Sequence, residues 1–163
     1  MELEDIPAEV RWEIATKAAL TSSMGYNMAF REIVGAKTVD QVEDAVDTEA
    51  GRQVKIIADS LGLPAASAIE VDDAFGIVGM IIMGKMEYEP IEITNNRVVQ
   101  HITNCPILNT GKEMNAPIGS MPNHCQAFSK SAVEGLNQKY THNFSKQMCA
   151  GDEYCQYAIE LKK

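Results

Sequence analysis

The feature that most constrains the fold is a change in the spacing of apolar residues near residue 86. Up to that point, apolar residues recur at steps of three and four, which is the spacing of an amphipathic helix. Beyond it, short stretches alternate apolar and polar residues, which is the period of a half-buried β-strand. A chain that starts with helices and continues with alternating strands predicts an α+β fold, with N-terminal helices packed on an antiparallel sheet.

Two long helices are expected first. Residues 7–35 predict one helix, because Pro7 suits a first helical turn and Gly35 suits a C-terminal stop. A second helix is expected to begin at the capping box Thr38-Val39-Asp40-Gln41 and to continue to Leu61. Gly51 is a weak point that could divide this second helix, since glycine is a poor helix former.

A third helix is expected from another capping box, Ser67-Ala68-Ile69-Glu70, to about Lys85. Its second half, residues 75–83, is apolar on every face, which predicts burial all round. The acidic pair Asp72-Asp73 in its first half is expected on a solvated face.

A β-hairpin is expected over residues 87–94 and 97–104. Its turn is Asn95-Asn96, since asparagine tolerates the positive φ that tight turns require. Pro90 lacks the N–H that a sheet ladder needs, so the first of the two strands is predicted at a sheet edge.

A helical insertion and a second hairpin complete the expected sheet. The insertion has a short helix over 108–114 and a longer one over 122–138, and the hairpin joins residues 140–148 to 155–161. The prediction is therefore a four-stranded antiparallel sheet made of two hairpins with a helical insertion. One domain is expected over residues 1–163, with a helical half (1–86) and a half with the sheet and all the cysteines (87–163).

Charge and apolar runs limit the possible surroundings of the protein. The net charge is −9, from 14 basic and 23 acidic residues, which argues against binding to nucleic acid or to an anionic membrane. The longest apolar run, residues 74–83, is shorter than the roughly 20 residues that span a bilayer. No basic and apolar leader opens the chain. We therefore expect a cytoplasmic protein, in which cysteines are thiols or metal ligands rather than disulfides.

All four cysteines lie near the predicted ends of strands and helices: Cys105, Cys125, Cys149 and Cys155. A tight turn between Cys149 and Cys155 would bring their sulfurs close together. Four thiols at converging element ends could hold a tetrahedral Zn²⁺ or an iron–sulfur cluster. The alternative is that they pack as small buried hydrophobes, which fits Cys125 best because it lies on an apolar helix face.

Histidines supply the other candidate site residues. His101 shares a predicted strand face with Cys105, so it could ligate a metal or act as general base to a Cys105 thiolate in a catalytic pair. The alternative for His101 is a core histidine hydrogen-bonded to a neighbour. His101, His142 and Tyr157 are the candidate ligand-binding residues, with His142 expected to face inward.

The C-terminal part of the chain resembles a known family. Asn104-Cys105-Pro106 closes a strand, a helical insertion with Cys125 follows, and the last hairpin reads Cys149-Ala150-Gly151-Asp152-Glu153-Tyr154-Cys155-Gln156-Tyr157-Ala158-Ile159. These features resemble the 4-vinyl-reductase-like domains, and among them the relatives named after L-2-amino-thiazoline-4-carboxylate hydrolase. The resemblance covers about 70 C-terminal residues, whereas the helical half matches in element order.

The resemblance implies an α+β domain that binds a small molecule beside a cysteine-based metal site, often as a dimer. In phenol-sensing members, cysteines and an acidic residue hold zinc near the last hairpin, whereas this chain has Lys146 three residues before Cys149. We expect a homodimeric small-molecule-binding domain with a zinc or iron–sulfur site next to an apolar pocket. The alternative is a hydrolase that opens a small cyclic C–N bond of the thiazoline-carboxylate type.

Overall fold

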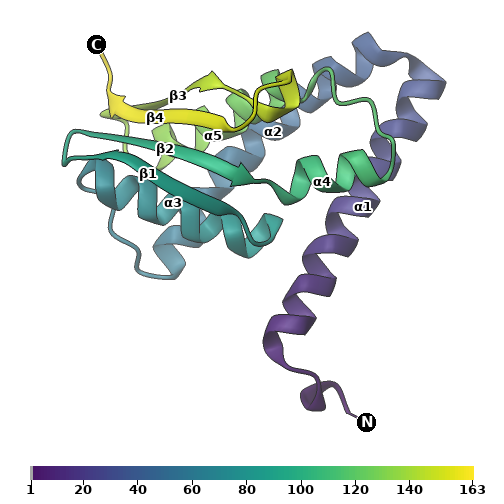
Figure 1. Cartoon of the computed structure of the whole chain (residues 1–163), viewed down its shortest axis with the longest axis horizontal. Helices are drawn as coiled ribbons and strands as arrows, with labels where there is room; N and C mark the ends of the chain where they lie inside the picture. The colour runs from purple at the N-terminus through teal and green to yellow at the C-terminus, as the bar shows by residue number, and fades with distance from the viewer. Residues whose placement is uncertain (1) are drawn as a thin grey trace.

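The computed structural model describes residues 2–163 (Figure 1). Three helices come first, a hairpin follows, two further helices are inserted, and a second hairpin ends the chain. The helices are α1 (Ala8–Val34), α2 (Ala36–Ser60), α3 (Ala68–Met83), α4 (Pro106–Glu113) and α5 (Met121–Leu136), and the strands are β1 (Glu87–Ile93), β2 (Arg97–Asn104), β3 (Tyr140–Lys146) and β4 (Cys155–Leu161).

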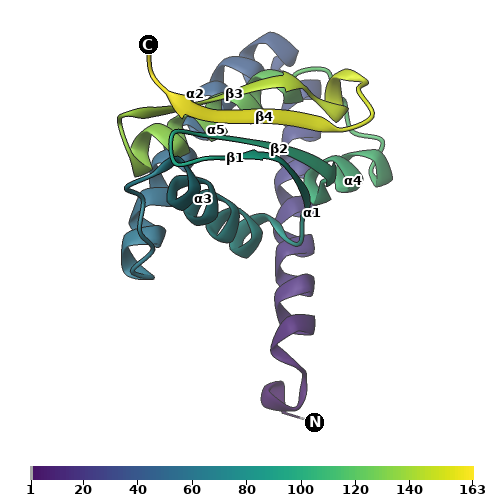
Figure 2. The ribbon, with the colours of Figure 1, turned by 60° about the vertical axis from the view of Figure 1, so that its left-hand side comes forward.

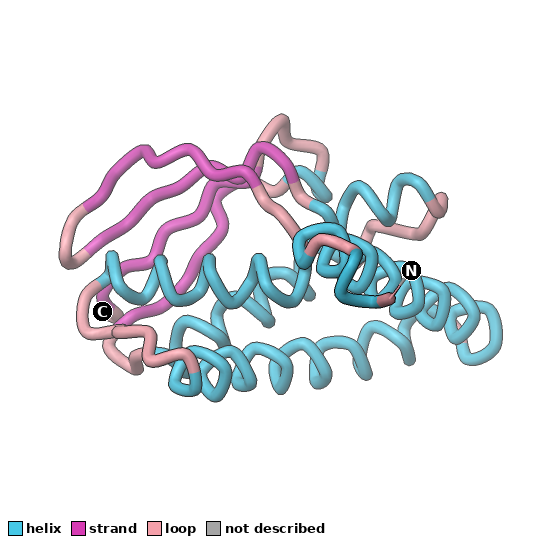
Figure 3. The backbone as a smooth tube through the Cα atoms, turned by 90° about the horizontal axis from the view of Figure 1, so that it is seen from below, coloured by secondary structure: helices cyan, strands magenta, loops and turns pink. Residues whose placement is uncertain are grey.

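The four strands form one antiparallel sheet in the order β1-β2-β4-β3. Each hairpin pairs within itself, and β2 pairs with β4 to join the two hairpins. Helices α2, α3 and α5 cover one face of this sheet (Figures 2 and 3). The predicted α+β class, the two hairpins and the helical insertion are therefore confirmed.

The core lies between the sheet and these three helices. Its fully buried side chains include five aliphatic ones that each come from a different element: Val54, Val78, Val98, Val133 and Ile159. Burying an aliphatic side chain of this size stabilises the fold by roughly 2 kcal/mol. The core thus fixes α2, α3 and α5 against the two central strands.

Helix α1 extends outside this core. Its N-terminal part projects away from the rest of the chain (Figures 1 and 2), and the Trp12 indole donates a hydrogen bond to the Ile81 carbonyl at 3.0 Å. Tyr26, Phe30 and Ile33 on α1 are exposed.

None of the helices between residues 2 and 163 combines the length and the hydropathy needed to cross a bilayer. The expected homodimer stays a prediction.

Two helix starts were predicted from capping boxes, and the structure supports one of them. The Ser67 hydroxyl accepts from the Glu70 N–H at 3.3 Å, and the Glu70 carboxylate accepts from the Ser67 N–H at 3.2 Å. The box predicted at Thr38 is wrong, because α2 already begins at Ala36. Gly35, with φ of 83°, breaks α1 and lets α2 start without a linker.

The burial predicted for α3 is wrong in two places. Ile77 and Ile81 are exposed, because the sheet and α5 cover one side of α3 and leave the other open. Asp72, expected on a solvated face, is 5% exposed and accepts hydrogen bonds from the Tyr157 hydroxyl at 2.8 Å and the Gln100 amide at 2.6 Å. Burial raises the pKa of Asp72, and the two hydrogen bonds oppose that rise.

Gly51 does not divide α2, which is continuous through it. A Cβ atom at this position would lie 2.5 Å from the Phe128 carbonyl oxygen and 2.9 Å from the Ala132 backbone nitrogen. Both neighbours belong to the backbone of α5, so they cannot move aside cheaply. Glycine is needed at position 51 because α5 crosses α2 there at close range.

Gly51→Ala is expected to lower the free energy of unfolding by about 2 kcal/mol, because the added methyl group overpacks a backbone contact. Gly25→Ala is the matched control, since a Cβ at this position in α1 meets no atom within 4 Å. That control is expected to stabilise by about 0.5–1 kcal/mol through helix propensity. Urea unfolding followed by circular dichroism measures both, and equal effects would contradict the close crossing.

Candidate functional site

A cavity of about 380 Å³ lies between the helices and the inner face of the sheet. All five helices and all four strands contribute to its wall. Most of this wall is apolar, with methionine, isoleucine and phenylalanine side chains such as Met24, Met83, Ile118 and Phe128. The space is therefore suited to the apolar body of a small organic molecule.

All four cysteines lie in the wall of this cavity. Cys105 follows β2 and caps α4, Cys125 lies near the start of α5, Cys149 lies in a short 3₁₀ turn, and Cys155 is the first residue of β4. Four segments that are distant in sequence thus bring one thiol each to the same space. These are the four predicted metal ligands.

The end of the last hairpin is held by hydrogen bonds that position Cys149. The Asp152 carboxylate accepts from the Gln147 N–H at 2.7 Å, and the Met148 N–H donates to the Cys155 sulfur at 3.2 Å. Gly151 supports the turn with φ of 106°, in the left-handed region that glycine adopts readily. Cys149 is thereby held beside Cys125.

The four thiols differ in acidity. A hydrogen bond donated by the Cys125 thiol, together with nearby backbone N–H groups, lowers the pKa of Cys149 to about 7, against the effect of burial. The same hydrogen bond and burial raise the pKa of Cys125. Burial raises the pKa of Cys105, and raises that of Cys155 to about 11. Cys149 is therefore the thiol that is partly ionised near neutral pH.

The donor set fits a thiolate-binding metal, since four sulfurs face one space and one of them ionises readily. Within residues 2–163, no three of these sulfurs lie mutually within 4.8 Å. Thiolates around one zinc are separated by about 3.8 Å, so zinc binding would require the sulfurs to move closer together. A larger iron–sulfur cluster tolerates wider spacing between the sulfurs.

Lys146 is exposed and donates to the Tyr154 hydroxyl at 2.7 Å, away from the thiols.

His142 also lies in the cavity wall and faces inward, as expected. It is fully buried, and neither ring nitrogen has a hydrogen-bond partner among the described residues. Its ring stacks on Tyr157 at 4.8 Å between centroids and meets the edges of Phe75 and Phe144. Burial lowers the pKa of His142 to about 3, so the imidazole is neutral and free to bond to a cavity occupant.

Two other predicted site residues do not line the cavity. His101 lies on the opposite face of β2 from Ile102, which does line it. The His101 Nε2 atom is 3.0 Å from the Gln156 amide oxygen, and the ring stacks on Tyr154 at 3.9 Å. Tyr157 lies behind His142 and donates to Asp72. The structure therefore does not bring His101 together with Cys105.

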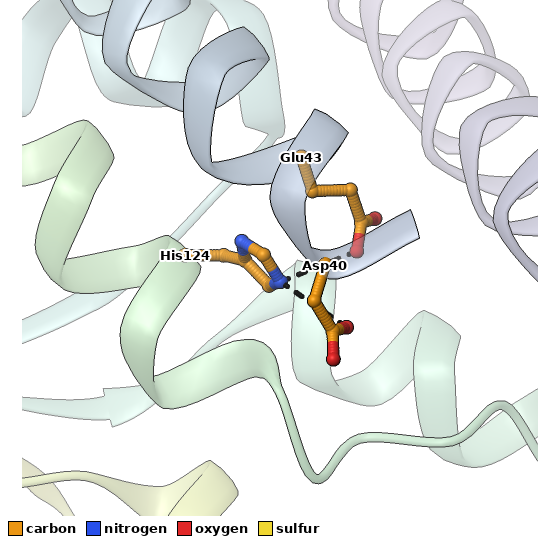
Figure 4. A group of neighbouring side chains, drawn as sticks. All are labelled: Asp40, Glu43 and His124. Carbon is orange, nitrogen blue, oxygen red and sulfur yellow. Dashed lines mark ion pairs between the residues drawn. The ribbon is translucent and has the colours of Figure 1, made fainter. Parts of the chain in front are cut away.

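Sequence reasoning missed one cluster, which joins α2 to α5. His124 Nε2 lies 3.2 Å from Glu43 Oε2 and 3.9 Å from Asp40 Oδ1 (Figure 4). His124 Nδ1 lies 3.2 Å from Asp47 Oδ2. Arg31 Nη2 lies 2.6 Å from Asp40 and 2.9 Å from Glu43. The available signal was the spacing of the three carboxylates, at steps of three and four on one face of α2.

Comparisons with known proteins show the fold. No protein-family model matches this chain, and no curated protein matches it either. Among solved structures, the phenol-responsive sensory domain of the transcription activator PoxR, with phenol, has a TM-score of 0.61 at 10% identity and covers 87% of this chain and 74% of its own. A trafficking protein particle complex subunit 3 from Naegleria fowleri, covalently bound to palmitic acid, has a TM-score of 0.60 at 10% identity. The match covers 92% of this chain and 96% of that subunit.

His142 gives the site a measurable pH dependence. Its pKa is lower in the folded chain than the ordinary value of 6.5, so the unfolded chain takes up the proton first as the pH falls below 6.5. Stability is therefore lost from there down to about pH 3. Between pH 7 and pH 4, we expect the wild type to lose about 3 kcal/mol more than His142→Phe.

Urea unfolding of both proteins at the two pH values measures this difference, and acid effects from other residues are common to both. Equal losses would show that His142 is not held neutral in the folded chain.

Proposed function

We propose that this protein is a small-molecule-binding domain whose ligand lies in the cavity beside the four cysteines. The observation that carries the proposal is the cavity itself, with a volume of about 380 Å³. Ligand sites have volumes of roughly 300–1,000 Å³ and are mostly apolar with few polar groups, which describes this cavity.

The two similar structures support an organic ligand. The PoxR sensory domain is described with phenol and the other protein is covalently bound to palmitic acid, so domains of this fold accommodate small organic molecules. The apolar wall of the present cavity suits the same broad class. The unpartnered nitrogens of His142 suit a ligand with a hydrogen-bonding group.

A cavity-filling variant tests this function. Ser22 and Ser23 are both exposed on α1, and of the two Ser23 lines the cavity whereas Ser22 does not. Ser23→Trp is expected to weaken binding of the neutral apolar fluorophore N-phenyl-1-naphthylamine about tenfold, because the indole takes its space. Ser22→Trp, the matched control, is expected to bind it as the wild type does.

The fluorescence increase on titration with the fluorophore measures both variants. A wild type that does not bind, or two variants that bind equally well, would contradict ligand binding in this cavity.

We further propose that Cys105, Cys125, Cys149 and Cys155 hold zinc or an iron–sulfur cluster. Such a group would supply a rigid link between the start of α5, the end of β2 and the last hairpin, and a cluster would add redox chemistry. The support is that all four thiols line one cavity and that the pKa of Cys149 is about 7.

Metal analysis of protein purified without oxygen tests this site. We expect about one zinc per chain, or iron with sulfide and a broad absorption band near ~400 nm. The Cys149→Ser/Cys155→Ser variant is expected to lose most of that metal. A metal-free wild type, or unchanged metal content in the double variant, would contradict the cysteine site.

The alternative function, a hydrolase that opens a small cyclic C–N bond, stays a prediction. Its candidate catalytic pair was His101 with Cys105, and these residues lie on opposite sides of the sheet. Cys149 is the more suitable nucleophile by its pKa of about 7. The arrangement of the described residues supports binding over hydrolysis.

A further inference from the structure

We propose a second metal site, for a divalent cation such as Mn²⁺, held by Asp40, Glu43 and His124. It goes beyond the proposed function, because its oxygen and nitrogen donors share no residue with the cysteine site. Asp40 and Glu43 lie one turn apart on α2, and His124 comes from the first turn of α5 (Figure 4). One ligand atom from each lies within 4.8 Å of the other two.

The distances suit a first-row divalent ion. His124 Nε2 and Glu43 Oε2 are 3.2 Å apart, and His124 Nε2 and Asp40 Oδ1 are 3.9 Å apart. Neighbouring ligand atoms around such an ion are separated by about 3.0–3.4 Å, given bonds of about 2.0–2.2 Å. A small movement of the Asp40 side chain, which is 42% exposed, completes the set.

The imidazole of His124 supplies an independent observation. Its side chain is 13% exposed, and both ring nitrogens are buried without a hydrogen bond within the described part of the chain. Carboxylate oxygens lie 3.2 Å from each nitrogen, yet off the direction in which an N–H would donate. A buried nitrogen beside an oxygen that it does not hydrogen-bond is suited to sharing a cation with it.

Charge favours a dication in this cluster. Asp40, Glu43 and Asp47 carry three negative charges when ionised, and the Arg31 guanidinium supplies one positive charge, so the carboxylates outnumber this permanent cation by two. A divalent cation would neutralise the excess.

Arg31 does not complete the cluster by itself. Its Nη2 atom donates to Asp40, Glu43 and Ser120 at 2.6–2.9 Å, whereas the nitrogens of His124 make no hydrogen bond within the described residues. Arg31 Nη2 contacts the same two oxygens that lie nearest His124 Nε2, Asp40 Oδ1 and Glu43 Oε2, so a metal would use the second lone pair of each of these oxygens. Arg31 would then orient the two carboxylates from outside the metal.

The position of the site suggests its role. Glu43 and His124 line the same cavity as the cysteines, so a cation bound there faces the ligand. Three protein ligands leave coordination positions for water or an anionic oxygen. We expect the site to favour a ligand with a carboxylate group whose apolar part lies against the methionine and isoleucine side chains.

Titration with Mn²⁺, followed by loss of the electron paramagnetic resonance signal of the free ion, tests this site separately from the thiols, which Mn²⁺ binds poorly. We expect about one Mn²⁺ per wild-type chain, with micromolar affinity. Glu43→Gln and His124→Gln are expected to weaken binding at least about tenfold, and the milder Asp40→Asn is expected to act in the same direction with its fold retained.

Two controls make the test specific. Asp44→Asn removes an exposed charge from the same helix and is expected to leave Mn²⁺ affinity unchanged. Cys149→Ser/Cys155→Ser is also expected to retain Mn²⁺ binding, so that the two metal proposals fail or succeed separately. A wild type that binds no Mn²⁺, or affinity unchanged in both Glu43→Gln and His124→Gln, would overturn the proposal and leave a cluster neutralised by Arg31 alone.

Discussion

The close crossing of α2 and α5 at Gly51 is the contact on which the rest of the structure depends. The two helices run in the same direction, since Asp47 approaches His124 and the Thr48 carbonyl accepts from the Ser131 hydroxyl at 2.6 Å. One missing side chain at Gly51 lets the two backbones meet. The close packing of α2 against α5 places the carboxylates of α2 around His124. It also directs the start of α5, with Cys125, toward the last hairpin.

Polar groups are buried between the helices and the sheet at some cost in stability. Asp72 offsets its burial with two hydrogen bonds, from Tyr157 and Gln100. His142 has no such partner and faces the cavity. A buried polar atom without a partner is rare in native proteins and calls for an explanation, such as a ligand or water. The cavity, its four thiols and this imidazole are consistent with one occupied site.

The sequence predicted what is encoded locally. The Ser67 capping box and the Asn95-Asn96 turn were found because their signals span a few residues. Neither Asn95 nor Asn96 has the positive φ on which that turn was predicted. Gly51 was misread, since its role depends on a helix more than 70 residues later. His101 and Cys105 were placed on one face by strand alternation, but Cys105 caps α4 and has left the strand.

A crystal structure of anaerobically purified protein, with anomalous scattering data, tests the central claim most directly. We predict electron density for an organic molecule in the cavity, in contact with His142 and bordered by the four cysteines, together with an anomalous peak at the sulfurs. A cavity closed by repacked side chains, with no organic density and no anomalous scatterer beside Cys149, would contradict the account.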